Sequence, residues 1–195
     1  MVGLYVAPPA GSTVVDLDEL GPVAAKAYPG PSWSADGHRP HFTPDYGRHG
    51  TLWVYGALAH REGRVFIETA EVRDTVSWLH FLDGLESFVP EGEVYLIMDP
   101  LSLHWTLATM LWNWGHQRFH FVPMPKKAAW LNLLEGFWKI LRQRSLAGRN
   151  LRDTGGLAAA LHAGVDDWDR HPTPFLWGRT PRPKRHFKRT YVYRI

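Results

Sequence analysis

Residues 74–145 alternate between helix-like and strand-like segments, and this alternation constrains the fold more than any other feature of the sequence. Two short apolar runs, VYLIM at 94–98 and RFHFVPM at 118–124, are separated and followed by segments whose apolar residues recur at helical spacing. The VYLIM run has no polar alternation, which predicts a strand that is buried on both faces. The alternation as a whole predicts a mixed α/β sheet.

The first part of the chain adds three strands and one long loop to this pattern. We expect strands at 12–20, 51–59 and 64–72, the last two forming a hairpin, and a Gly- and Pro-rich loop over 21–47. Helices are expected at 74–88, 102–114, 131–145 and 154–169. In the first of these, Asp74 is the expected N-cap, and the apolar side carries Val76, Leu79, Leu82 and Leu85.

Composition excludes several classes of protein. The chain has no cysteine, which rules out disulfides and thiolate metal sites and fits a reducing cytoplasm. No apolar run approaches the roughly 20 residues that a membrane span needs, so we expect no membrane partner. The ten tryptophans indicate a heavily aromatic core. We expect one domain over 1–178 and a basic C-terminal tail over 179–195.

Three carboxylates lie at or near the ends of the expected elements. Asp18, followed by Glu19, ends the first strand, and Asp99 ends the VYLIM strand. Adjacent parallel strands would bring Asp18 and Asp99 together at one edge of the sheet. Glu135 lies at the edge of the apolar arc that Leu131 marks on its helix, so we expect it to point partly toward the sheet.

Three converging carboxylates would repel one another unless a cation were bound, and hard oxygen ligands suit Mg²⁺ or Mn²⁺. Two such ions can activate water and stabilise a leaving oxygen in phosphodiester cleavage. Two other interpretations stay open at this point. Glu135 could simply pair with Lys139 one turn later. Acids at strand ends of a mixed sheet also describe many phosphatases and receiver-type domains.

Five stretches of the sequence, in order, carry a resemblance to a known family: LYVAPPAGSTVVDLDEL, DYGRHGTLWVYGAL, VYLIMDPLSLH, HFVPMPKKAAWLNLLEGFW and HPTPFLWGRT. Together they resemble the catalytic domain of the DDE transposases, in the bacterial insertion-sequence branch of the mariner superfamily (insertion sequence 630 type). Asp99 and Glu135 are separated by 35 residues, close to the spacing of that branch. The resemblance implies an RNase H-like fold.

The resemblance also implies site residues and a reaction. Asp18, Asp99 and Glu135 would be the catalytic metal ligands for two Mg²⁺ or Mn²⁺ ions, and Glu19, His104 and Asn132 would have supporting roles. Water would cut a phosphodiester at the transposon end, and the freed 3′-hydroxyl would then attack target DNA. A protein of this kind would act in the bacterial cytoplasm, on the nucleoid.

Partners follow from the same resemblance. They are double-stranded DNA, as transposon ends and target, and a second copy of the chain. Full-length relatives carry an N-terminal helix-turn-helix region, which we expect to be absent here and encoded separately, truncated or excised. Pro100 stands where the family usually has Asn, which puts the order around Asp99 in doubt.

Basic residues are the expected contacts to DNA phosphates. The candidates are Arg48, His49, Lys126, Lys127, Arg142, Lys184 and Arg185. Solvated basic surface is an open alternative for the helix and for the tail, and a core role is open for Arg48 and His49. Two rival functions also remain: a decayed or domesticated transposase fragment that binds DNA without turnover, and a different RNase H-like nuclease.

Overall fold

A five-stranded mixed sheet forms the centre of the computed structural model, which describes residues 2–30, 47–125, 128 and 131–175. The sheet order is β3-β2-β1-β4-β5. Its strands are β1 (Ser12–Ala24), β2 (Thr51–Ala59), β3 (Arg64–Ala70), β4 (Glu93–Met98) and β5 (Phe119–Pro123). Five helices and a 3₁₀ turn complete the described elements: α1 (Val2–Val6), α2 (Thr75–Phe88), η1 (Ser102–Trp105), α3 (Leu107–Gly115), α4 (Leu134–Leu146) and α5 (Thr154–Asp169).

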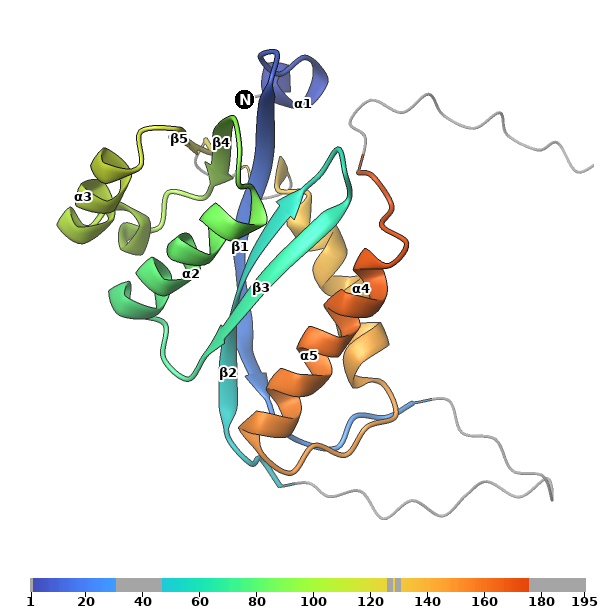
Figure 1. Cartoon of the computed structure of the whole chain (residues 1–195). Helices are drawn as coiled ribbons and strands as arrows, with labels where there is room; N and C mark the ends of the chain where they lie inside the picture. The colour runs from blue at the N-terminus through green and yellow to red at the C-terminus, as the bar shows by residue number, and fades with distance from the viewer. Residues whose placement is uncertain (1, 31–46, 126–127, 129–130, 176–195) are drawn as a thin grey trace, which may run out of the picture.

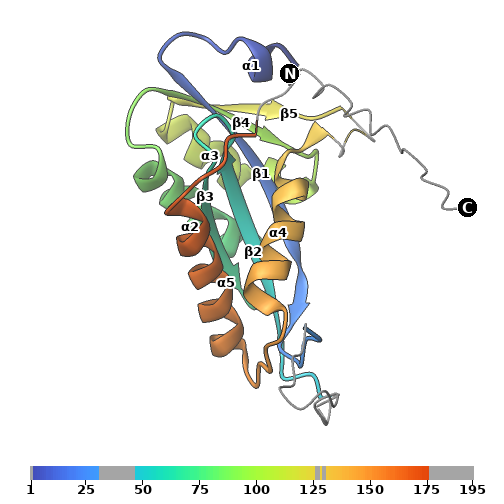
Figure 2. The same cartoon turned by 90° about the vertical axis from the view of Figure 1, so that its right-hand side faces the viewer.

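Helices cover both faces of the sheet, as the expected mixed α/β architecture requires. Helices α2 and α3 lie on one side, and α4 and α5 on the other (Figure 1). The view onto this second face shows α4 and α5 side by side in front of β2 and β3 (Figure 2). Each side has its own apolar core, with Leu82 and Leu85 of α2 buried in one and Leu141 and Leu161 in the other.

Strand pairing determines which residues meet at the edge of the sheet. Strands β1, β2 and β3 are antiparallel neighbours, and β4 lies parallel to both β1 and β5. The parallel β1–β4 pairing, the arrangement under which we expected Asp18 and Asp99 to meet, aligns Asp16 with Ile97. Strand β4 is buried from Leu96 to Met98, so the prediction of a strand covered on both faces is confirmed.

The expected end of the first strand and the expected start of the loop that follows it are both wrong. The first strand does not end at Leu20, because a register shift between Leu20 and Val23 carries β1 past Gly21 and Pro22 to Ala24. Asp18 and Glu19 therefore lie inside β1 rather than at its end, and the expected loop over 21–47 begins later; its residues 31–46 lie outside the described part of the chain.

The expected helix over 102–114 is divided in two. The 3₁₀ turn η1 comes first, and Thr106 then adopts an extended conformation and caps α3 by accepting a hydrogen bond from the Thr109 N–H at 3.2 Å. Helix α4 also begins three residues later than expected, so Leu131 precedes it.

In α2 the Asp74 cap is confirmed, because its side chain accepts a hydrogen bond from the Ser77 N–H at 2.9 Å. Val76, which we expected on the apolar side, is 74% exposed. Trp78, Phe81 and Phe88 are buried in its place.

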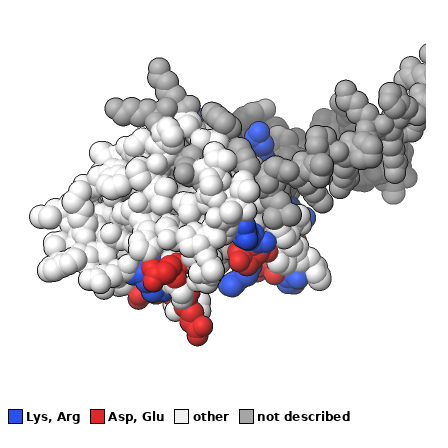
Figure 3. Space-filling view, turned by 90° about the horizontal axis from the view of Figure 1, so that it is seen from above, with Lys and Arg blue, Asp and Glu red and all other residues white. Residues whose placement is uncertain are grey.

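One short helix was not expected from the sequence. Helix α1 precedes β1 and buries Tyr5 beside Val14 of β1 and Ile97 of β4, which are inner strands of the sheet. Seen from above, from the end of the molecule where α1 lies, the described surface carries few charged side chains, and these gather along one border (Figure 3). Among the helices of the described residues, none combines the length and the hydropathy that crossing a bilayer requires.

Candidate functional site

Asp18 and Asp99 lie at the same level of two neighbouring strands. Asp99 directly follows the buried strand β4, and the register that aligns Asp16 with Ile97 brings Asp18 level with Asp99. Burial, together with the charges of Glu19 and Asp99, raises the pKa of Asp18 to about 7, although a hydrogen bond from Trp138 acts to lower it. This part of the sheet therefore concentrates negative charge in a poorly solvated place.

A histidine lies between two of the carboxylates. His104 is 1% exposed, and its Nε2 is 2.8 Å from Oε1 of Glu19 while its Nδ1 is 3.2 Å from Oδ1 of Asp99. The ring of Trp78 packs on the imidazole with the two ring centroids 4.4 Å apart. The turn η1 is what brings His104 back to Asp99, since the His104 Nδ1 also lies 3.0 Å from the Asp99 backbone carbonyl.

The charge state of His104 follows from these contacts. Burial alone lowers the pKa of His104, but hydrogen bonds and charge from Asp99 and Glu19 outweigh it and raise the pKa to about 9. The same hydrogen bond to His104 holds the pKa of Asp99 below its ordinary value. At neutral pH the imidazole is therefore a cation that fixes the orientation of two carboxylates.

The donor atoms around His104 are spaced as a metal ion would require. Glu19, Asp99 and His104 each offer one ligand atom, and the three atoms lie within 4.8 Å of one another. A protonated imidazole does not coordinate metals, so the carboxylates are the better donors of this group. Oδ1 of Asp99 is buried, and the group facing it among the described residues is the imidazole of His104, whose Nδ1 lies 3.2 Å away.

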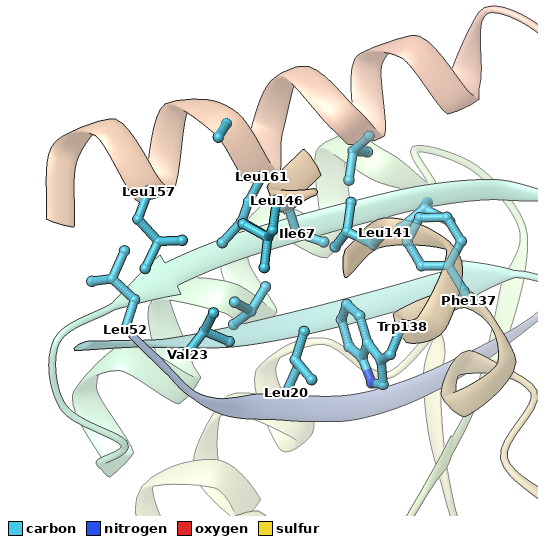
Figure 4. Packing of buried hydrophobic residues seen from close by; sticks show 14 of the residues in the cluster. Leu20, Val23, Leu52, Ile67, Phe137, Trp138, Leu141, Leu146, Leu157 and Leu161 are labelled. Carbon is cyan, nitrogen blue, oxygen red and sulfur yellow. The ribbon is translucent and has the colours of Figure 1, made fainter. Parts of the chain in front are cut away.

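Asp18 faces the opposite side of the sheet from Glu19. Its Oδ2 accepts a hydrogen bond of 2.9 Å from Nε1 of Trp138 on α4. The close view shows Trp138 with its indole nitrogen turned toward β1 (Figure 4). Trp138 is 6% exposed within the core formed with α4 and α5, in agreement with the aromatic core that the ten tryptophans indicate.

Glu135 lies in the first turn of α4 and is exposed. The expectation that it points partly toward the sheet is wrong, because it counted Leu131 as helical, whereas Leu134, Phe137 and Trp138 form the buried side. Within the described residues no ion pair joins Glu135 to Lys139. The structure therefore groups Asp99 with Glu19 and His104, and it leaves both Asp18 and Glu135 outside this close group of ligand atoms. Asp18 is linked to Asp99 by the strand register and by the interaction of their charges.

Asn132 connects the two elements that carry Asp18 and Glu135. Its Nδ2 donates to the Leu17 carbonyl at 2.8 Å, and its Oδ1 accepts from the Leu134 N–H at 3.0 Å. Because Asn132 is 4% exposed, both hydrogen bonds are shielded from water. The expected supporting residue thus fixes the start of α4 against β1.

Sequence reasoning missed a second buried polar group on the same face as Asp18. The Tyr5 hydroxyl donates to Oδ1 of Asp16 and lies 3.0 Å from the Leu131 carbonyl, while Nδ1 of His60 is 3.5 Å from Oδ2 of Asp16. Burial raises the pKa of Asp16. The available signal was the alternation in VVDLD, which puts Asp16 and Asp18 on one face of a strand.

A basic groove lies beside the C-terminal half of α4. It is a cavity of about 670 Å³ between the end of β1 and α4, and its charged lining residues are Lys26, Arg48, Lys139 and Arg142, with no acid among the lining residues described. Arg48 and Arg142 were expected DNA contacts; Lys26 and Lys139 were not. His49 is exposed nearby without lining the groove.

Four other predicted DNA contacts fall outside the described residues. They are Lys126, Lys127, Lys184 and Arg185.

Comparison with known proteins agrees with this geometry. A family model described as "DDE superfamily endonuclease" matches residues 13–158. No curated protein matches the sequence.

Three solved structures are similar in fold. A Mos1 transposase paired-end complex with the left transposon end has 13% identity and a TM-score of 0.56, covering 83% of this chain and 48% of that one. The catalytic core domain of BIV integrase has 12% identity and a TM-score of 0.53, covering 85% and 88%. A simian T-cell lymphotropic virus intasome, in complex with a PP2A regulatory subunit, has 10% identity and a TM-score of 0.53, covering 76% and 46%.

These likenesses identify the fold. The mixed five-stranded sheet flanked by helices is the RNase H-like fold of transposases and integrases, as the sequence predicted. The chain spans about half the length of the Mos1 transposase chain.

Proposed function

Since the chain belongs to the DDE superfamily endonucleases, we propose that it is a transposase catalytic domain that cuts DNA and joins the freed strand to a target. Within that family we assign it to the insertion sequence 630 type. The observation that carries the proposal is the pairing of β1 with β4, which brings Asp18 level with Asp99 beside the first turn of α4. A phosphatase or a receiver-type domain would not account for the family match.

Asp18, Asp99 and Glu135 are the proposed metal ligands. The donor set consists only of carboxylate oxygens, which suits Mg²⁺ or Mn²⁺. Burial and the charges of Glu19 and Asp99 raise the pKa of Asp18, so a bound cation would favour its ionised form. Two bound ions would activate the attacking oxygen and stabilise the leaving oxygen.

The remaining residues hold this site in place. His104 orients Asp99 and Glu19 from the α2 side of the sheet, and Asn132 fixes the start of α4 against β1. Glu135, exposed in the first turn of α4, would have to meet Asp18 and Asp99 once metal and DNA are bound. Its exposure allows this movement, because no described ion pair has to be broken.

DNA is the proposed substrate, and the basic groove is its proposed contact surface. Lys139 and Arg142 follow Glu135 along α4, and Arg48 faces them from the start of β2. Phosphates of a strand leaving the cut site would meet these side chains in turn. This supports the DNA interpretation over that of a merely solvated basic face.

We also propose a second copy of the chain and a separately encoded helix-turn-helix protein as partners. The Mos1 structure is described as a paired-end complex with a transposon end, and such an assembly needs proteins on both ends. Mass photometry with and without DNA tests this part of the proposal. A complex that stays monomeric on paired ends would contradict it.

A plasmid-nicking assay tests the central claim. Supercoiled plasmid is incubated with the chain and Mn²⁺, beside Asp18→Asn, Asp99→Asn and Glu135→Gln. We expect nicking by the unmodified chain and none by the three variants. Glu62→Gln, an exposed acid in the β2–β3 turn, is the matched control and should nick normally. Nicking that persists in all three variants would refute the proposal.

A decayed or domesticated fragment is the second candidate. Pro100, which follows Asp99, favours it because proline removes a backbone donor beside the site. In that case the chain would bind DNA and not nick it, with or without a helix-turn-helix partner. Restored nicking in Pro100→Asn would identify Pro100 as the lesion.

A further inference from the structure

The indole of Trp138 makes a directed contact with Asp18. Its Nε1–H, which can only donate, lies 2.9 Å from Oδ2 of Asp18. The ring is 6% exposed and packs among the α4 and α5 core residues, so it has little freedom to turn. The contact therefore fixes one oxygen of Asp18 from a rigid support (Figure 4).

A glycine makes room for this contact. Gly56 of β2 is the cross-strand partner of Asp18. A Cβ atom at Gly56 would lie 2.3 Å from Cη2 of Trp138 and 2.7 Å from its Cζ2, which is too close. The backbone of Gly56 does not have a positive φ, so the position needs glycine for space and not for conformation. The indole thus occupies a slot beside Asp18.

Packing alone does not explain where the indole N–H points. Trp78 is buried at 1% exposure, and its Nε1 has no hydrogen-bond partner among the described residues. Trp168 satisfies its Nε1 with the backbone carbonyl of Gly63 at 2.7 Å. A buried indole in this chain can therefore do without a carboxylate, yet Trp138 is aimed at one that lies level with Asp99.

We propose that Trp138 is a positioning residue for metal binding: it holds Oδ2 of Asp18 and leaves Oδ1 to coordinate a divalent ion. This inference rests on the proposed function, because it takes Asp18 to be a metal ligand. A carboxylate that is held through one oxygen presents the other in a fixed direction, and ordered ligands bind metal more tightly. Gly56 serves the same purpose by providing the slot.

The test measures Mn²⁺ affinity directly, without any reaction. Free Mn²⁺ is titrated by electron paramagnetic resonance against the full chain and Trp138→Phe, which keeps an aromatic ring and loses the N–H. Losing a hydrogen bond to a metal ligand typically weakens binding by about 10- to 100-fold, and we expect a loss in that range. Gly56→Ala, which displaces the indole and keeps its N–H, should weaken binding in the same direction.

The chain offers a matched control. Trp112 donates from Nε1 to Oδ1 of Asp83 at 2.6 Å, an indole-to-carboxylate hydrogen bond between α3 and α2. Trp112→Phe removes the same kind of contact away from the site and should leave Mn²⁺ affinity unchanged. Thermal melts in chelator show which variants are folded at the titration temperature.

The possible outcomes distinguish the positioning role of Trp138 from the metal-binding role of Asp18. Mn²⁺ binding that is lost in Asp18→Asn but unchanged or tighter in both Trp138→Phe and Gly56→Ala would overturn the role of Trp138 and leave the proposed function standing. Equal binding by the unmodified chain and Asp18→Asn would overturn the metal role of Asp18, and the inference with it. Weaker binding in Trp138→Phe and Gly56→Ala, but not in Trp112→Phe, is the supporting result.

Discussion

The charge on His104 makes stability depend on pH in a defined direction. Its pKa is raised from 6.5 to about 9, so folding favours the protonated form. The stabilisation is complete below pH 6.5 and is lost as the pH rises through 9. The shift corresponds to about 3 kcal/mol at most. Urea unfolding of the metal-free chain at pH 7 and pH 9.5 should show this loss.

His104→Gln is the control for that pH dependence. Glutamine keeps hydrogen-bonding groups near Glu19 and Asp99 and has no titration in this range. The stability difference between pH 7 and pH 9.5 should shrink markedly in the variant. The raised pKa of Asp18, about 7, acts mainly at lower pH and does not mask the effect. An unchanged difference would show that His104 is not a buried cation.

Asn132 is expected to contribute strongly to stability. Asn132→Ala leaves the Leu17 carbonyl and the Leu134 N–H without their partner in a buried place. Each unsatisfied group costs about 1–3 kcal/mol, so we expect a loss of about 2–4 kcal/mol in chemical denaturation. Asn113→Ala is the comparison, because Oδ1 of Asn113 already has no partner among the described residues. Similar losses in the two variants would contradict the role of Asn132.

Helix α2 shows where helical periodicity misleads. Val76 fits the apolar spacing but is 74% exposed, whereas Leu85 is 0% exposed against the sheet. Val76→Ala should change the free energy of unfolding by less than about 0.5 kcal/mol, and Leu85→Ala should cost about 2–5 kcal/mol. Denaturant titration of the two variants measures this difference directly. A large loss in Val76→Ala would indicate that another surface covers the start of α2.

The elements that the sequence predicted well are those defined by local signals. The apolar run of β4 and the Asp74 cap need only neighbouring residues, and both were found. The level arrangement of Asp18 and Asp99 followed from parallel pairing. Contacts that depend on tertiary packing could not be predicted from the sequence. No residue near Gly56 in the sequence predicts that the indole of Trp138 occupies the space where a side chain at position 56 would lie.

The same reasoning explains the error at Glu135. Leu131 continues the apolar spacing of α4, so periodicity alone extends the helix to it and widens the expected apolar side toward Glu135. The helix begins later because the Asn132 side chain takes the Leu134 N–H. Leu131 is thus not a helical position, and Glu135 lies exposed outside the buried side that Leu134, Phe137 and Trp138 form.

Charge is distributed unevenly over the molecule, and this gives a test of where DNA binds. The end seen in Figure 3 has few charged side chains, whereas the groove beside α4 is lined by Lys26, Arg48, Lys139 and Arg142. Lys139→Gln combined with Arg142→Gln should weaken duplex binding at low salt. Each lost phosphate contact should reduce the slope of log affinity against log salt by about 0.9. Fluorescence anisotropy over a salt series measures both quantities.

Arg144→Gln is the control for this surface, because it removes one positive charge from the same helix, whereas the double variant removes two. Arg144 is already paired with Asp167 at 3.2 Å and does not line the groove. Loss of net charge alone would weaken binding in proportion to the number of charges removed, whereas contacts within the groove would change the salt slope only for Lys139 and Arg142. Equal slopes for the double variant and Arg144→Gln would therefore exclude the groove and direct attention to basic residues elsewhere in the chain.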